Sequence, residues 1–86
     1  MKVTVKYFAS IRESIGQGSE VLQTSASTLG QLRSELAARG GAYAECLDAA
    51  FKGKTLRMAL NQDMSDDMAV LLEGCEVAFF PPVTGG

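Results

Sequence analysis

The last stretch of the sequence reads Glu76-Val77-Ala78-Phe79-Phe80-Pro81-Pro82-Val83-Thr84-Gly85-Gly86. Its first half is an almost continuous apolar run, which is typical of a strand buried on both faces of a sheet. The two prolines that follow lack a backbone N–H, and the two glycines lack a Cβ. We therefore expect a buried strand over residues 76–80 and a flexible tail over residues 81–86 that carries a carboxylate on an arm. A frayed chain end would have the same composition.

Hydrophobic periodicity predicts the elements that precede this strand. Polar and apolar residues alternate over residues 2–7, and a glycine-rich connection with one helical turn leads to a second short strand. Thr28 with Gln31 three residues later fits a capping box, and a leucine stripe follows it at helical spacing. The expected order is strands over residues 2–7, 20–24, 55–60 and 76–80, a main helix from residue 28 to about residue 39, and a shorter helix over residues 42–51, with residues 64–72 ambiguous.

This order predicts an α+β fold, with one domain over residues 1–80. A single sheet with one apolar face needs a covering helix, and the main helix supplies it. The first and last strands are the most apolar, so we place them side by side and parallel at the centre of the sheet. The result is the β-grasp arrangement of ubiquitin, a mixed sheet packed against one main helix. The tail then leaves from the centre of the sheet.

Composition excludes several kinds of site. The chain has no histidine, which excludes Ser-His-Asp and Cys-His catalytic groups and imidazole metal sites. Cys46 and Cys75 are far apart and outside any CxxC pair, so we expect buried free thiols and no metal site. The net charge of −2 argues against nucleic acid as a partner. The first residues alternate with lysines and form neither a signal peptide nor a membrane span, so we expect a cytoplasmic protein.

Charge is unevenly distributed along the chain. All eight lysines and arginines lie within residues 1–57. A solvated acidic edge would explain the remaining, wholly acidic part. The alternative expectation is that the surface near the tail meets a basic partner. The acidic residues of this part are Asp63, Asp66, Asp67, Glu73 and Glu76.

Three stretches carry a family resemblance. They are Val5-Lys6-Tyr7-Phe8-Ala9 with Ile11-Arg12-Glu13, then Ala59-Leu60-Asn61-Gln62, and above all the segment from Gly74 to Gly86. These stretches resemble the small subunit of molybdopterin synthase, a ubiquitin-like sulfur carrier of molybdenum-cofactor biosynthesis. The resemblance runs from the first strand to the last residue, and the terminal segment is highly specific. Cys75 departs from the family, which usually has aspartate in this turn, and residues 40–54 match no family motif.

The resemblance implies that Gly86 is the reactive residue. An E1-like adenylyltransferase would use ATP and magnesium to convert its carboxylate to an acyl-adenylate. A persulfide sulfur donor would then replace AMP and leave a thiocarboxylate. Within a heterotetramer, the large catalytic subunit of molybdopterin synthase would pass this sulfur to cyclic pyranopterin monophosphate. No bound cofactor and no catalysis are expected from this chain alone.

The resemblance also implies which residues contact partners. Phe80 is the first choice, because alternation along a strand puts Phe79 and Phe80 on opposite faces and only one of them needs to point inward; packing of Phe80 in the core fits equally well. Arg12 resembles the family's Arg-Glu pair and could form ion pairs with the activating enzyme, although a solvated surface arginine fits it better; Glu76 is a weaker choice still. A Cβ on either terminal glycine would widen the arm in a narrow channel. The tail residues that would enter a partner are Pro81, Pro82, Val83, Thr84 and Gly85.

Other functions remain open for a chain that ends in Gly-Gly. The thiamine-pathway sulfur carrier has the same terminus, although the Phe-Phe-Pro-Pro-Val-Thr approach to it favours the molybdopterin branch. A ubiquitin-like modifier would join Gly86 to lysines of target proteins. A plain binding module would keep its function without Gly85 and Gly86.

Overall fold

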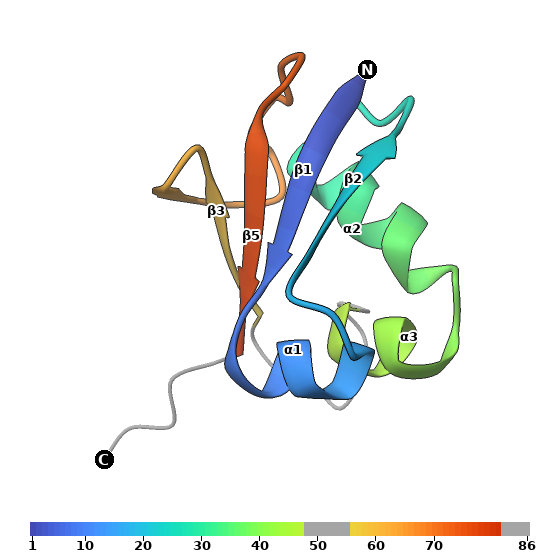
Figure 1. Cartoon of the computed structure of the whole chain (residues 1–86). Coiled ribbons are helices and arrows are strands. Elements are labelled where there is room, and N and C mark those ends of the chain that lie inside the picture. The colour runs from blue at the N-terminus through green and yellow to red at the C-terminus, as the bar shows by residue number, and fades with distance from the viewer. Residues whose placement is uncertain (48–55, 82–86) are drawn as a thin grey trace.

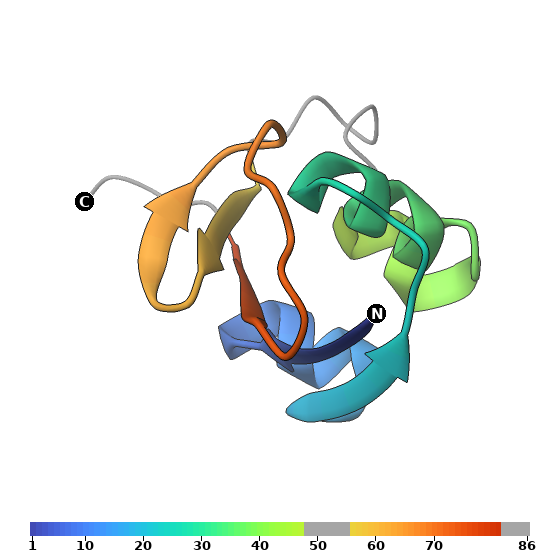
Figure 2. The same cartoon turned by 90° about the horizontal axis from the view of Figure 1, so that it is seen from above.

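A five-stranded mixed sheet forms the centre of the protein in the computed structural model, which describes residues 1–47 and 56–81 (Figure 1). In chain order the elements are β1 (Lys2–Tyr7), α1 (Ala9–Ile15), β2 (Ser19–Gln23), α2 (Leu29–Ala37), α3 (Gly41–Leu47), β3 (Arg57–Leu60), β4 (Asp63–Ser65) and β5 (Glu76–Phe80). The strand order across the sheet is β2-β1-β5-β3-β4. The helices α2 and α3 lie together on one side of the sheet (Figure 2).

The first and last strands are parallel neighbours, as predicted. Val5 lies opposite Val77 and Tyr7 opposite Phe79 in their register. β2 is antiparallel to β1, and β3 is antiparallel to both β5 and β4. Because a tight turn cannot join parallel strands, the intervening chain crosses one face of the sheet and brings α2 there. The β-grasp fold, with a mixed sheet packed against one main helix, is confirmed.

The core lies between the sheet and α2. Alternate residues of β1 and β5 point inward, and the leucine stripe of α2 meets them, so the stripe is core as predicted. The rings of Tyr7 and Phe79 stack with their centroids 6.1 Å apart, which links the two central strands through side chains as well as backbone. The largest core side chains, each less than 2% exposed, are Tyr7, Phe79, Leu29, Leu32, Leu36, Leu47, Val3, Val5 and Val77.

The predicted cap begins α2, with one difference. The Thr28 hydroxyl accepts a hydrogen bond from the backbone N–H of Gln31 at 3.2 Å. The Gln31 side chain accepts from the backbone N–H of Ser27 at 2.7 Å, one residue before the partner that a reciprocal capping box uses. The backbone N–H of Gly30 donates to the Asp67 carbonyl at 3.0 Å. The chain before β5 thus satisfies N–H groups that a helix start leaves unpaired.

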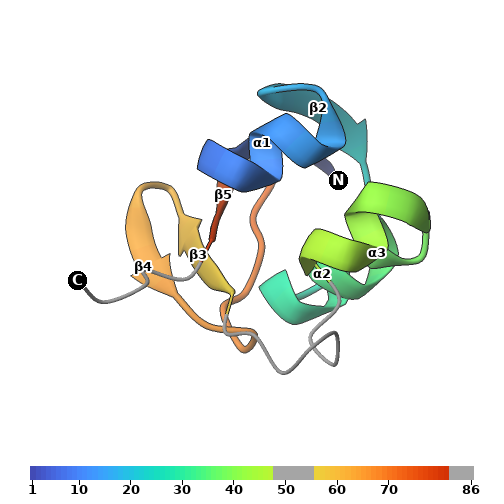
Figure 3. The same ribbon diagram turned by 90° about the horizontal axis from the view of Figure 1, so that it is seen from below.

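Two elements differ from the prediction. α1 is a helix of seven residues where one helical turn was expected. β4 occupies Asp63–Ser65, where a turn and an ambiguous stretch were expected. The reason is the tight reversal at Asn61 and Gln62, whose φ angles of 49° and 72° suit a two-residue hairpin loop. The chain therefore returns directly alongside β3 (Figure 3).

The helix boundaries after α2 also shift. α2 ends at Ala37, two residues before the expected end, and α3 begins at Gly41, one of the two glycines expected to separate the helices. Residues 48–55 lie outside the described part of the chain. The predicted end of the second helix therefore stays a prediction. The third strand begins at Arg57 instead of residue 55, because Leu56 before it is not part of the strand.

A hydrogen-bond network around Glu20 ties the helices to the sheet. Its carboxylate accepts from the Tyr7 hydroxyl at 2.8 Å, from Gln17 at 3.1 Å and from Arg39 at 3.1 Å. Arg39 also lies over the Tyr43 ring, 4.8 Å from its centroid. Burial, followed by the hydrogen bond to Glu20, raises the pKa of Tyr7 above its usual value. The Tyr7 hydroxyl therefore stays protonated and keeps donating to Glu20.

Replacing Glu20 with alanine is expected to lower the free energy of unfolding by about 1–3 kcal/mol, because the buried Tyr7 hydroxyl would lose its acceptor. The contact with the more exposed Arg39 adds little to this loss. Urea unfolding of Glu20→Ala beside Glu13→Ala, which removes an exposed carboxylate from α1, measures the effect. Equal unfolding midpoints for the two variants would contradict this role of Glu20.

Candidate functional site

The predicted contact residue Phe80 is the last residue of β5, the central strand of the sheet. Phe79 before it is 0% exposed in the core, whereas Phe80 points to the opposite face and is partly exposed. The two rings therefore lie on opposite faces of the sheet, as the alternation predicts, and contact between Phe80 and a partner stays a prediction. Pro81 follows directly and is also partly exposed. Phe80 thus stands on the sheet where the tail begins.

Phe8 is a second aromatic residue at this position, and the sequence analysis did not assign it a role. Its ring stacks on the ring of Phe80, with the centroids 4.7 Å apart and the planes 8° from parallel. Its backbone N–H donates to the Phe79 carbonyl at 3.2 Å, which fixes the end of β1 beside the end of β5. Phe8 remains 38% exposed. The pair therefore presents aromatic surface to solvent at the start of the tail.

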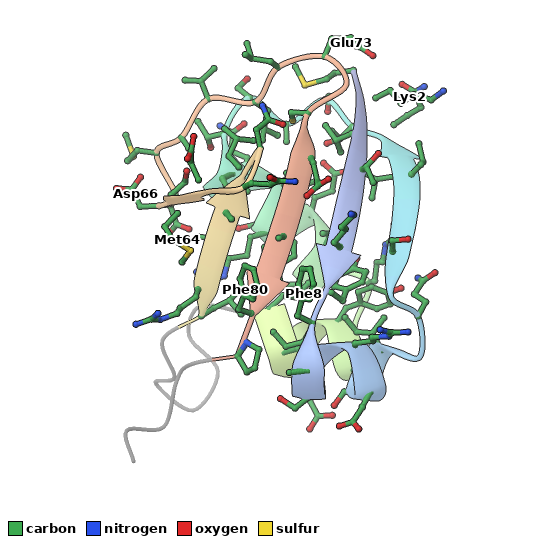
Figure 4. The ribbon with its side chains drawn as sticks, turned by 60° about the vertical axis from the view of Figure 1, so that its left-hand side comes forward. Lys2, Phe8, Met64, Asp66, Glu73 and Phe80 are labelled. Carbon is green, nitrogen blue, oxygen red and sulfur yellow. The ribbon has the colours of Figure 1, made fainter. Side chains whose placement is uncertain are left out.

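Met64 of β4 extends this apolar surface across the sheet. It lies opposite Ala59, which in turn lies opposite Ala78, so the three side chains share the face that carries Phe80. Met64 is 61% exposed, whereas both alanines are buried. Figure 4 shows Met64, Phe80 and Phe8 across one face of the sheet, with the helices behind it. We call Phe8, Met64 and Phe80 the tail-root patch.

No short sequence pattern joins the three members of the tail-root patch. Phe8 follows the alternating residues of β1, and Phe80, on which its ring stacks, lies 72 positions later in the sequence. Met64 belongs to the stretch that the sequence left ambiguous. The signal that could have found Phe8 is an aromatic residue directly after an otherwise regular strand. Met64 could be assigned to the patch only from the strand order, which places β4 beside β3.

Of the two charged residues predicted to contact partners, Arg12 is joined to the tail-root patch by its backbone, whose N–H donates to the Phe8 carbonyl at 3.3 Å, whereas Glu76 lies away from the patch. Glu76 is the first residue of β5, at the opposite end of the strand from Phe80, and forms an ion pair with Lys6 at 3.5 Å. Arg12 lies on α1, with its side chain against Gly18 in the loop before β2. That loop flanks β1 on the side away from β5, because the Gly18 carbonyl accepts from the Tyr7 backbone.

Three acidic residues of the C-terminal third, Glu73, Glu76 and Asp63, lie away from Pro81, where the tail begins. Glu73 accepts a hydrogen bond from the backbone N–H of Lys2 at the beginning of β1, and Glu76 begins β5. Asp63 pairs with Leu60 at the far end of β3. A five-residue strand spans roughly 13 Å between its first and last Cα atoms, so closeness in sequence was misleading here. Glu73, Glu76 and Asp63 therefore do not surround Pro81, and a basic partner for the surface near the tail stays a prediction.

The described residues contain no group of three or more histidine, cysteine, aspartate or glutamate side chains that could hold a metal ion. Cys75 is a buried free thiol, as predicted, whereas the free thiol of Cys46 is only partly buried. In residues 1–47 and 56–81, no helix has the length and apolar character needed to cross a membrane. The predicted site residues Pro82, Val83, Thr84, Gly85 and Gly86 lie beyond the described part of the chain.

Comparisons with known proteins agree with the resemblance read from the sequence. Two curated relatives named molybdopterin synthase sulfur carrier subunit, from Haemophilus influenzae and Escherichia coli, are 39% and 38% identical over 84 residues, which cover 98% of this chain and 99% of each relative. A chain in the solved complex of subunits 1 and 2 of molybdopterin-converting factor from Helicobacter pylori is 26% identical, with full coverage of both chains and a TM-score of 0.67. A model of the ThiS family matches residues 5–86. The chain therefore belongs to the ThiS family, within which it is similar to the sulfur carrier subunits of molybdopterin synthase.

Proposed function

We propose that this chain carries sulfur on the carboxyl group of Gly86 and delivers it within a heterotetrameric molybdopterin synthase in the cytoplasm. The observation that carries the proposal is the tail-root patch, which stands at the end of the central strand directly before a Pro-Pro-Val-Thr-Gly-Gly sequence. The curated relatives that share the full length of the chain are named for this function. The large subunit is the proposed recipient, since the Helicobacter pylori relative is seen in a complex of subunits 1 and 2.

The chemistry begins by activating a poor electrophile. The Gly86 carboxylate attacks the α-phosphate of ATP on an E1-like adenylyltransferase that supplies magnesium, and pyrophosphate leaves. The terminal sulfur of a persulfide donor then attacks the acyl carbon, and AMP leaves, so that the donor is joined to Gly86 through an acyl disulfide. A thiol attacks the donor's sulfur and breaks the S–S bond, so that the donor and the thiol leave as a disulfide. The resulting thiocarboxylate is ionised at neutral pH, and its sulfur is a strong nucleophile. It attacks cyclic pyranopterin monophosphate, and hydrolysis returns the Gly86 carboxylate, so two rounds supply the two sulfurs of the dithiolene.

In this scheme the chain contributes positioning. Five residues follow Pro81 and span at most roughly 17 Å when extended, which is enough to reach a pocket inside a partner. The two prolines limit the conformational entropy that the tail loses on insertion. The tail-root patch gives the partner an apolar surface to hold, so that the tail enters at a fixed point. The proton transfers and the pterin site belong to the partner.

The intact mass of the purified chain, after incubation with its E1-like activator, ATP and a persulfide donor, tests this proposal. The expected result is a mass gain equal to the exchange of one oxygen for one sulfur, absent from a chain that lacks Gly86. An unchanged mass with an activator that still consumes ATP would contradict the proposal. A gain of sulfur without transfer to the large subunit would instead favour the thiamine-pathway carrier, and a trapped isopeptide with lysine would favour a protein modifier.

A further inference from the structure

Arg57 stands directly beside the start of the tail. It is the first residue of β3, and its partner in the antiparallel register of β3 and β5 is Phe80. Directly opposed residues in a sheet point to the same face and lie about 5 Å apart at Cβ. Met58, the next residue of β3, is in the core, so Arg57 points to the open face of the sheet. Its side chain is exposed.

The open face is therefore divided by charge along the strands. Arg57 marks the end where Phe80 and Pro81 lie. At the other end, Glu76 begins β5 and Asp63 pairs with Leu60 of β3. Lys6, between the two ends, is already engaged by Glu76 at 3.5 Å. Figure 4 shows Glu73 at the opposite end of the sheet from the pair of Phe8 and Phe80.

The other charged residues near Phe80 do not cancel the positive charge of Arg57. α1 begins directly after Phe8 and carries exposed Arg12 and Glu13, whose opposite charges offset each other. The Arg12 side chain also lies against Gly18, and Gly18 is on the opposite side of β1 from Phe80. None of the ion pairs found among residues 1–47 and 56–81 involves Arg57. A guanidinium is thus available where a partner would surround Pro81.

We infer that Arg57 is a docking residue that binds a carboxylate on the rim of the pocket into which the large subunit of molybdopterin synthase admits the tail. This inference rests on the proposed function, and it names the charge of the partner surface, which is acidic. The net charge of the chain is −2, so an acidic partner would otherwise be repelled. With Glu73 and Glu76 at the far end of the sheet and Arg57 beside Phe80, the carrier instead approaches with the tail leading.

Association kinetics with the purified large subunit test this inference. We expect Arg57→Glu to lower the association rate constant about tenfold at low salt, and the difference to shrink as salt screens the charges. Arg57→Lys should retain most of the rate, because a rim charge acts mainly through its sign. Lys2→Glu is the matched control, since it makes the same change of charge at the opposite end of the sheet and should leave the rate close to that of the unmodified chain.

Two results would overturn the inference. An unchanged association rate for Arg57→Glu would do so, and so would a slow rate that does not depend on salt, because that would indicate lost packing. Thermal unfolding of each variant confirms that the sheet is intact. Failure of the unmodified chain to bind the large subunit would contradict the proposed function as well, whereas normal binding with no effect of Arg57 would leave the proposed function standing.

Discussion

Removal of Gly86 is expected to abolish sulfur transfer while leaving the free energy of unfolding unchanged. The new terminal carboxylate, on Gly85, would fall short of its former position by roughly 3.5 Å, the length of one extended residue. A misplacement of about 1 Å already costs on the order of 100-fold in rate at a reaction centre. Stability should not change, because every buried residue of the described core precedes Pro81.

Formation of molybdopterin in a reaction that contains the activator, ATP, the persulfide donor and the large subunit measures the first effect, because it requires both activation of the tail and transfer of its sulfur. Thermal unfolding measures the second effect. A chain with one glycine added after Gly86 is the matched control for reach, since it shifts the carboxylate by the same length in the other direction. It should be equally inactive. Sulfur transfer by the shortened chain, or a clear fall in its unfolding temperature, would contradict the proposed role of the tail.

Alanine at Phe80 and at Phe79 should have opposite consequences although the residues are neighbours. Phe80→Ala removes the ring that stacks on Phe8 and is expected to weaken binding of the large subunit by about 30-fold or more, as for a central interface residue. Its cost in stability should stay near 1 kcal/mol, the usual worth of an aromatic pair. Phe79→Ala empties a position that is 0% exposed and is expected to cost about 3–5 kcal/mol of stability.

The comparison requires both an equilibrium dissociation constant and an unfolding curve for each variant. Phe8→Ala is a useful third variant, because it opens the same stack from the other strand and should resemble Phe80→Ala in both measurements. If Phe80→Ala lowered stability as much as Phe79→Ala did, the ring would be part of the core. The tail-root patch would then lose its assigned function.

The sequence predicted those elements whose pattern is local. β1 and α2 show a strand or helix period over five or more residues, and β5 is an almost continuous apolar run followed by two prolines, so their types and approximate bounds follow without knowledge of the neighbours. β4 does not, because three residues that include Asp63 carry no strand pattern of their own. Its extended form results from pairing with β3 after the reversal at Asn61 and Gln62.

The candidate site was predicted in part for the same reason. Phe80 could be selected because alternation within one strand separates it from Phe79. Phe8, Met64 and Arg57 lie on three other segments, and only the strand order places them beside Phe80. Glu76 lies close to the tail along the chain but at the opposite end of β5 from Phe80. Surface chemistry around a site depends on which strands are neighbours, and a single sequence does not give this.

The position of β5 has a consequence for how the protein is made. The central strand of the sheet is also the last strand of the chain, so β1 and β3 have no common neighbour until residues 76–80 are available. Contacts such as Thr4 with Glu76 join segments far apart in sequence, and such contacts form late and slowly. A ribosome that stalls before this strand releases a chain without the middle of its sheet. Unfinished products should therefore reach proteases in an open state, and only chains synthesised through the last strand should present a tail to the activator.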